Sequence, residues 1–226
     1  MDGILIVDKP QGWTSHDVID FIRKRFCIEK AGHTGTLDPM ATGVLVVLLG
    51  RYTKLSEKLM ADNKEYKAVL TLGANTDTQD ATGKITKEAQ VPELKKNDIE
   101  AVLKKFTGPI EQIPPMVSAL KVGGRTLYKL ARQGKEIERK PRSIVIEKLE
   151  LESFNLPDIS IGLTCQKGTY VRTLCEDIAL ELGTCGHMSY LRRTRSGNFR
   201  IEQAVDIETL KNISKEELTG FCVENG

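Results

Sequence analysis

The residues of this chain best suited to chemistry lie in one short segment, residues 32–43. It reads Gly-His-Thr-Gly-Thr-Leu-Asp-Pro-Met-Ala-Thr-Gly and joins two apolar stretches. Polar loops held between regular elements often carry catalytic side chains. Asp38 has no second acidic residue within five positions on either side, so it is a poor metal ligand on local grounds. We therefore consider Asp38 a candidate nucleophile or base.

The proline that follows Asp38 limits the backbone of the segment. Pro39 fixes its own φ and pushes the preceding residue out of the helical region, so Asp38 is expected to be extended and to direct its carboxylate into a cleft. A capping role for the next element explains Asp38 equally well. The sequence leaves four roles open for His33: a base, a ligand, a stacking surface, or a surface side chain that makes hydrogen bonds.

Two distant residues are candidates for the same site. Arg172 lies in the first helical turn after Gly168-Thr-Tyr-Val, where a cation is disfavoured by the helix dipole. A carboxylate partner would explain it, and we expect Asp38, with Glu176 four residues on as the alternative. Tyr66 begins an alternating strand pattern and should point inward, either to a site or simply to the core.

Charge is distributed unevenly along a chain that is close to neutral. The formal net charge is +2 over 226 residues. Two basic segments, residues 121–148 and 192–200, would suit a polyanion bound on one face, although a solvated surface is the alternative. The second segment holds four arginines and no acid: Arg192, Arg193, Arg195 and Arg200.

Several classes of site and location are disfavoured by the sequence. The five cysteines form no CxxC pair, which argues against structural zinc and a disulfide framework and favours a reducing, cytoplasmic location. No apolar stretch approaches the roughly 18 residues of a membrane span. No P-loop or dinucleotide fingerprint occurs, and Asp77 and Asp80 are too few for a calcium loop.

The hydrophobic pattern predicts strands and helices without strict alternation, which indicates an α+β fold with a mixed or antiparallel central sheet flanked by helices. Residues 107–124, with three prolines and a Gly-Gly pair, should be irregular. No linker divides the chain, so we expect one domain over 1–226. Strands are predicted at 4–7, 44–49, 66–72, 144–151, 159–165 and 189–196. Helices are predicted at 15–26, 53–60, 97–106, 125–132, 171–182 and, weakly, 203–218, and the helix at 97–106 is expected to be capped by Asn97 or Asp98.

Five blocks of residues, in order, resemble the bacterial TruB-type tRNA pseudouridine synthases over nearly the whole chain. The second block, residues 32–45, contains the Asp38 segment, and a match of this length with four further blocks is highly specific. The blocks are residues 6–15, 32–45, 64–67 with 76–80, 114–121 with Leu127 and Tyr128, and 168–174 followed by 191–193.

The resemblance implies isomerisation of one uridine, at position 55 in the T-arm of tRNA, without cofactor or metal. It implies Asp38 as nucleophile, Arg172 as the partner of Asp38, and Tyr66 as the stacking ring and proposed general base. Its substrate-binding positions are His33, which flips or holds the loop, Tyr66, Tyr170, Leu191, Lys9 and, in an RNA-gripping thumb inserted at about 109–140, Arg125 and Lys129.

The chain departs from many family members in one respect. Only about 25 residues follow Phe199, too few for the PUA-like C-terminal RNA-binding domain, which we expect to be absent. We expect a stand-alone monomeric enzyme that binds the tRNA T-arm and no membrane. Two rival functions are an RNA-folding chaperone or RNA-binding module on the same scaffold, and an aspartyl enzyme that handles phosphate and requires a divalent metal.

Overall fold

The structure is a computed structural model that describes residues 1–60, 62–118, 120–122, 125–127, 130, 133 and 137–223. The chain forms two compact units. The first comprises Met1–Lys67 and Leu191–Gly226, and the second comprises Ala68–Tyr190. The chain passes from one unit to the other within strand β4 (Lys64–Leu72) and returns within strand β12 (Gly186–Ser196). The chain was expected to form a single domain over 1–226. The division into two compact units does not test that expectation, which stays a prediction.

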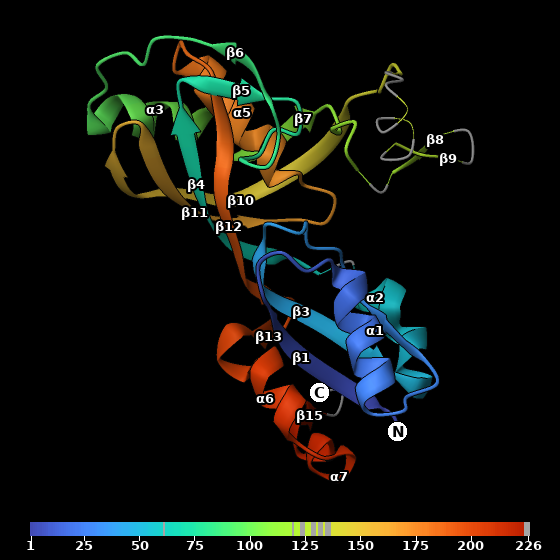
Figure 1. Cartoon of the computed structure of the whole chain (residues 1–226). Helices are drawn as coiled ribbons and strands as arrows, with labels where there is room; N and C mark the ends of the chain where they lie inside the picture. The colour runs from blue at the N-terminus through green and yellow to red at the C-terminus, as the bar shows by residue number, and fades with distance from the viewer. Residues whose placement is uncertain are drawn as a thin grey trace. The chain divides into compact units, whose positions relative to one another are not determined.

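The first unit contains a sheet of mixed direction, with strand order β14-β1-β3-β12. Strands β1 and β3 lie side by side in it (Figure 1). β1 (Gly3–Lys9) pairs antiparallel with β3 (Thr42–Leu49), from Gly3 opposite Leu49 to Lys9 opposite Gly43. β14 (Val205–Asp206) runs parallel to β1, and β12 runs parallel to β3. Three short strands complete it: β2 (Ala31–His33) on β3, β13 (Phe199–Arg200) on β12, and β15 (Cys222–Val223) on β1.

Strand β3 is buried on both faces, as its continuous apolar sequence predicts. Leu45, Val47 and Leu49 pack into a cluster with helix residues such as Val18 and Leu210. The alternate side chains pack on the opposite face in a second cluster, with members Val44, Val46, Leu48 and Phe199. Because both faces are filled, the loop that leads into β3 has a rigid support.

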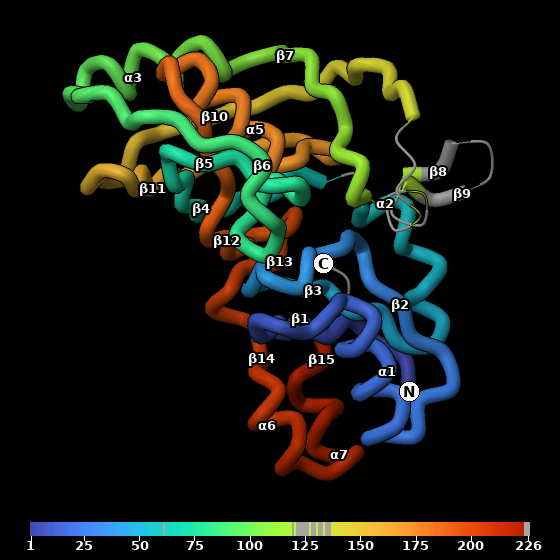
Figure 2. The backbone as a smooth tube through the Cα atoms, turned by 45° about the horizontal axis from the view of Figure 1, so that its top comes forward, coloured from blue at the N-terminus to red at the C-terminus, as the bar shows by residue number. Residues whose placement is uncertain are grey.

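Three helices contribute to the first of these clusters: α1 (Ser15–Arg25), α6 (Ile207–Asn212) and α7 (Lys215–Leu218). α6 and α7 follow one another after β14 (Figure 2). Thr14 caps α1 and forms a capping box with Asp17, which fixes where the helix begins. The second cluster is covered by residues of the 3-10 helix η1 (Gly50–Leu55) and of α2 (Ser56–Met60).

The second unit continues the strand order as β12-β4-β11-β10-β7. The long strand β10 (Arg142–Asn155) pairs antiparallel with both β11 (Asp158–Cys165) and β7 (Gly108–Gln112). Helix α3 (Lys96–Lys105) packs on β10 and on α5 (Val171–Glu181). Two small hairpins are formed by β5 (Ala74–Thr76) with β6 (Ile85–Glu88), and by β8 (Lys121–Val122) with β9 (Arg125–Thr126).

The α+β class with a mixed sheet is confirmed, and three local predictions are wrong. Residues 108–112 form β7, although 107–124 was expected to be irregular. α3 is capped at Lys95, and Asp98 accepts a hydrogen bond from the Lys95 N–H as the third residue of the helix. The expected helix at 53–60 begins as the 3-10 turn η1. Most of the expected helix at 125–132 lies outside the described residues.

Candidate active site

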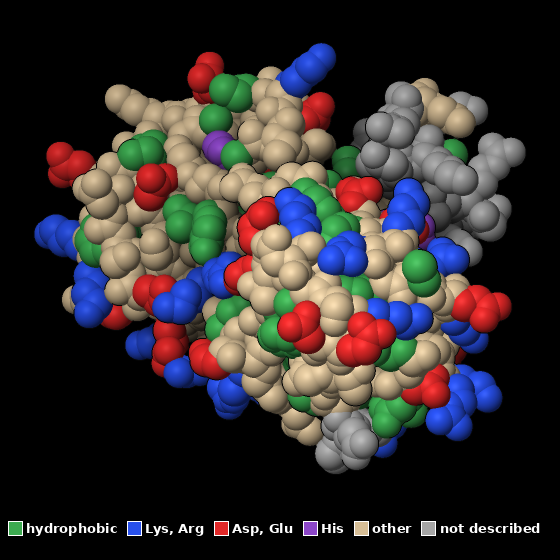
Figure 3. Space-filling view, turned by 60° about the horizontal axis from the view of Figure 1, so that its bottom comes forward, with side chains coloured by type: hydrophobic (Ala, Val, Ile, Leu, Met, Phe, Trp, Pro, Cys, Tyr) green, Lys and Arg blue, Asp and Glu red, His purple; other side chains and the backbone are tan. Residues whose placement is uncertain are grey.

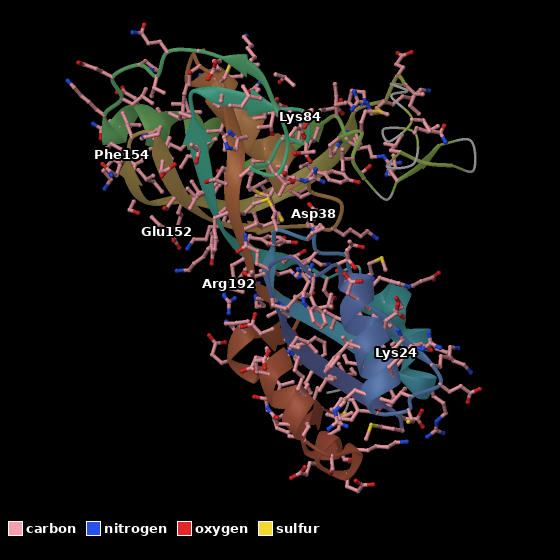
Figure 4. All side chains as sticks on the ribbon, viewed as in Figure 1. Lys24, Asp38, Lys84, Glu152, Phe154 and Arg192 are labelled. Carbon is pink, nitrogen blue, oxygen red and sulfur yellow. The ribbon has the colours of Figure 1, made fainter. Side chains whose placement is uncertain are left out.

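Asp38 lies in the loop that leaves β2 at His33 and enters β3 at Thr42 (Figure 4). It is half-buried, and its backbone oxygen accepts a hydrogen bond from the Ala41 N–H at 3.0 Å. The element that follows is a strand, so Asp38 does not cap a helix. A partly accessible carboxylate on a tightly turned loop is suited to chemistry.

Both neighbours of Asp38 are fixed by the segment between β1 and α1. The buried Ser15 hydroxyl donates to the Leu37 oxygen at 3.1 Å and accepts from the Leu37 N–H at 2.8 Å. On the other side, the Gly12 N–H donates to the Pro39 oxygen at 2.8 Å. The backbone is therefore held immediately before and after Asp38, which reduces the freedom of the carboxylate.

Lys9 places a buried ammonium beneath this loop. Its side chain is 0% exposed, and Nζ donates to the backbone oxygens of Pro10 at 2.8 Å, Trp13 at 2.5 Å and Pro39 at 3.3 Å. Burial lowers the pKa of Lys9 to about 8, while the negative charge of Asp38 acts in the opposite direction. Lys9 and Asp38 thus attract one another in the folded protein. A direct substrate contact by Lys9 stays a prediction.

His33 begins the loop and is half-buried. Its Nδ1 accepts a hydrogen bond from the Gly35 N–H at 3.3 Å, so the geometry assigns a lone pair to that nitrogen. Burial lowers the pKa of His33, and the positive charges of Arg193 and His16 lower it further. A neutral ring suits stacking or hydrogen bonding to a base, which are among the roles expected for it.

Arg172 is buried at the start of α5, where it contacts three residues of the second unit. Nη1 donates to the Thr78 oxygen and Nη2 to the Val117 oxygen, both at 2.8 Å, and Nε lies 3.9 Å from Asp80 Oδ2. Glu176, the alternative partner, accepts a hydrogen bond from Gln79 Nε2. The pair of Arg172 with Asp38 joins residues of different units and stays a prediction.

The remaining expected pocket residues are distributed over both units. Tyr66 in β4 is half-buried, whereas Ala68 and Leu70 on the same face are fully buried. Leu191 in β12 is 6% exposed. Gln112 fixes the backbone of Tyr170, accepting from its N–H at 2.8 Å and donating to its oxygen at 3.1 Å. Their roles toward a substrate stay predictions.

Three arginines of the basic segment 192–200 bond to partners within the first unit. Arg192 forms an ion pair with Asp8 at 2.7 Å, and Arg195 forms one with Glu65 at 2.7 Å. Arg193 is buried and donates to backbone oxygens. On the face drawn in Figure 3, acidic and basic side chains are interspersed. This segment is therefore a poor candidate for a free cationic patch.

The expected thumb is only partly described. Arg125 is placed in β9 by its backbone, and Lys129 lies outside the described residues. Within the described part of the chain, no group of three His, Cys, Asp or Glu side chains is arranged to hold a metal ion. Among the same residues, no helix is long and apolar enough to cross a membrane.

Comparison with known proteins identifies the family. The family model described as TruB family pseudouridylate synthase (N terminal domain) matches residues 23–171. The model for the tRNA pseudouridylate synthase B C-terminal domain matches residues 172–220. The chain belongs to the TruB family of pseudouridylate synthases. The family resemblance expected from the five blocks is thereby confirmed.

Relatives in this family are similar over most of the chain. The tRNA pseudouridine synthase B of Francisella philomiragia subsp. philomiragia is 51% identical over 96% of this chain and 72% of the relative. That of Symbiobacterium thermophilum is 50% identical over 93% of this chain and 71% of the relative.

Two solved structures have a similar fold over most of this chain. A chain of a Cbf5-Nop10-Gar1 complex has a TM-score of 0.74 and 34% identity, with 93% of this chain and 54% of that chain covered. A chain of an H/ACA RNP bound to a substrate RNA containing 2'-deoxyuridine has a TM-score of 0.71 and 31% identity, with 93% of this chain and 52% of that chain covered. This chain therefore spans about half the length of both.

Sequence reasoning assigned no role at the candidate site to four residues: Gly12, Ser15 and Arg193, which bond to the Asp38 loop in the first unit, and Asp80, which lies beside Arg172 in the second unit. Asp80 accepts hydrogen bonds from the hydroxyls of Thr78 and Thr82, and its Oδ2 lies 3.9 Å from Arg172 Nε. The signal was present, because all four lie inside the matched blocks. Gly12, Ser15 and Arg193 bond to the backbone on either side of Asp38, and Asp80 forms an ion pair with Arg172; spacing in the sequence cannot reveal such contacts.

Proposed function

We propose that this protein converts uridine to pseudouridine at position 55 of tRNA, in the T-arm loop, with Asp38 as the nucleophile. The proposal is supported by membership of the TruB family and by curated relatives named tRNA pseudouridine synthase B at about 50% identity. The observation that carries the assignment of Asp38 is its loop, which is hydrogen-bonded at Leu37 and at Pro39 on either side of the carboxylate.

The proposed reaction is an isomerisation that rearranges bonds within one nucleotide. The bond between C1′ of the ribose and N1 of uracil breaks, and a bond between C1′ and C5 forms. C5 loses a proton and N1 gains one, so substrate and product have the same formula and no oxidant or reductant is required. A fixed, ionised carboxylate can attack either the sugar or the base to start this sequence, and both routes need Asp38 in its charged form.

A positive charge lies close to the Asp38 loop in the first unit. The buried ammonium of Lys9 attracts the Asp38 carboxylate, and the mutual effect raises the pKa of Lys9 against the larger effect of burial. We propose that Arg172 supplies a second positive group for the Asp38 carboxylate. Its guanidinium is held by the Thr78 and Val117 oxygens and needs little reorganisation.

The target base must leave its stack before reaction. Extruding a nucleotide costs a few kcal/mol, and stacking on an aromatic ring recovers about 1–3 kcal/mol per base. We assign that stacking to Tyr66, with His33, Tyr170 and Leu191 as further pocket residues. The thumb at 109–140, through Arg125 and Lys129, is proposed to grip the RNA backbone. The protein is proposed to act in the cytoplasm as a monomer on the tRNA T-arm.

The decisive experiment uses a tRNA transcript and measures pseudouridine after incubation with purified protein. We expect the wild type to form about one pseudouridine per tRNA, and a transcript with cytidine at position 55 to yield none. Asp38→Ala should lose at least about 10³-fold in rate, as expected for a nucleophile, and still bind tRNA. Asp20→Asn, on the surface helix α1, is the matched control and should keep full activity.

The same experiment distinguishes the isomerase from the rival function. An RNA-folding chaperone would need no carboxylate at position 38, so equal tRNA refolding by wild type and Asp38→Ala with no pseudouridine from either would reject the isomerase. Product formed equally by both proteins would reject Asp38 as the nucleophile while leaving the isomerase intact.

A further inference from the structure

Arg193 is buried in the first unit and connects three segments. Arg193 is only 2% exposed. Nε donates to the Val44 oxygen of β3 at 2.7 Å, and Nη2 donates to the Gly35 oxygen of the Asp38 loop at 3.1 Å. Arg193 itself belongs to β12, whose backbone pairs with β3 at Gly43. One guanidinium therefore ties the loop to the central strand.

The local backbone is shaped to admit this arrangement. Gly43 has φ +99°, and a Cβ there would overlap the backbone oxygen of Arg193. Only glycine allows β12 to approach β3 this closely at that point. A Cβ at Gly35 would lie 3.6 Å from Arg193 Nη1, so the guanidinium packs directly against the loop backbone.

A buried cation is a weak source of stability, because desolvation of the charge offsets much of what it gains. A neutral side chain would fill the same space at a smaller desolvation cost. The fork geometry of a guanidinium, however, can hold two oxygens at fixed positions at once, which a lysine ammonium does not reproduce. The presence of arginine here is explained better by placement of the loop than by stability.

We propose that Arg193 is a positioning residue for the reaction: it holds Gly35 against β3 and thereby sets where the Asp38 carboxylate stands. This inference rests on the proposed function. Ser15 and Gly12 fix the loop from the side of α1, and Arg193 fixes it from the side of β12. Its charge also reaches the loop, since Arg193 contributes to lowering the pKa of both His33 and Lys9.

The test compares Arg193→Lys with a control two residues further along the same face of β12. Arg195→Lys alters the ion pair with Glu65 and the hydrogen bond to the Gly197 oxygen, away from the loop. On tRNA, we expect Arg193→Lys to lower kcat about 10- to 100-fold with KM changed less than about 3-fold. Arg195→Lys should change both by less than about 2-fold. Wild-type kcat in a folded Arg193→Lys protein would overturn the inference.

A second measurement keeps the inference testable without activity. Amide hydrogen exchange of Arg193→Lys should show faster exchange confined to residues 34–41, whereas exchange in α1 and β1 should match the wild type. Faster exchange throughout the first unit would show a general structural role and would overturn the inference. If the wild type forms no pseudouridine, the proposed function fails, yet the exchange pattern still decides whether Arg193 holds the loop.

A third measurement separates charge from geometry. In NMR titrations with the His33 signal assigned by His33→Gln, Arg193→Met should raise the pKa of His33, because a nearby positive charge is removed. Arg193→Lys should leave it closer to the wild-type value. An unchanged His33 pKa in Arg193→Met would contradict the placement of the guanidinium beside the loop.

Discussion

Replacement of the buried Lys9 by methionine should have an effect on stability that depends strongly on pH. Methionine has a similar length and fills the same space, but it removes the charge and the three hydrogen bonds. The Pro39 oxygen keeps the hydrogen bond from the Gly12 N–H, whereas the Pro10 and Trp13 oxygens lose the bonds made by Nζ. Each carbonyl left unpaired costs about 1–3 kcal/mol, or about 2–6 kcal/mol for both.

The removed charge acts in the opposite direction. Burial lowers the pKa of Lys9 from 10.5 to about 8 in the folded protein. At about 1.4 kcal/mol for each pH unit, this difference destabilises the charged folded form by roughly 3 kcal/mol. Below pH 8 both the folded and the unfolded wild type carry the proton, so the full cost is present. At pH 7, Lys9→Met should therefore destabilise the protein by only about 1 kcal/mol.

The balance changes as the pH rises. Between pH 8 and 10.5 the folded wild type releases the Lys9 proton while its unfolded chain retains it, so wild-type stability rises relative to the variant. The destabilisation caused by Lys9→Met should thus grow by roughly 3 kcal/mol across this range. Other titrating groups are common to both proteins and cancel in the difference.

Urea unfolding followed by the fluorescence of Trp13, the one tryptophan of the chain, measures this difference at pH 7, 8, 9 and 10. Lys24→Met, at an exposed position of α1 (Figure 4), is the control and should change stability by less than about 0.5 kcal/mol at pH 7. A difference between wild type and Lys9→Met that stays constant from pH 7 to 10 would refute the lowered pKa and the electrostatic account of the loop.

Three further predictions concern the loop, helix α5 and the thumb. Ser15→Ala removes both hydrogen bonds to Leu37 and should cost about 1–3 kcal/mol in urea unfolding, with a lower kcat on tRNA; unchanged values of both would show that the hydroxyl does not hold the loop. Burial and then Glu176 raise the pKa of Asp177 to about 6, so the stability it contributes falls as pH rises from 4 to 6. Asp177→Asn should therefore stabilise the protein by about 1–3 kcal/mol at pH 7 and by nearly nothing at pH 4, and an equal effect at both values would contradict this. Charge reversal at Arg125 and Lys129 should weaken tRNA binding and reduce the slope of log affinity against log salt by about 2, and an unchanged slope would remove the thumb from the RNA interface.

The sequence was most informative where local pattern and burial agree. The apolar run 44–49 predicted a strand buried on both faces, and β3 is packed between two clusters. α1 was predicted within one residue at each end, because its start is fixed by a local capping box with Thr14. Such elements depend on interactions between residues close in sequence, which a pattern can show.

Predictions failed where the partner is distant. Residues 108–112 contain Pro109 and look irregular, but β10 supplies the hydrogen bonds that make them an edge strand. The arginines of 192–200 look like a free basic patch, yet Asp8 and Glu65 neutralise two of them from far along the chain. Local composition cannot reveal a pair whose second member lies more than a hundred residues away.

The same reasoning explains how the candidate site was predicted in part. Residue type and the unusual loop were enough to single out Asp38, because a lone carboxylate beside proline is visible in the sequence. The restraint on that carboxylate was not visible, because it acts through backbone oxygens: Ser15 on Leu37, Arg193 on Gly35, and Lys9, expected only as a substrate contact, on Pro39. A backbone oxygen is present at every residue and leaves no trace in composition. Sequence motifs thus single out a candidate for the reacting group, whereas the side chains that fix its position emerge only when their hydrogen bonds are known.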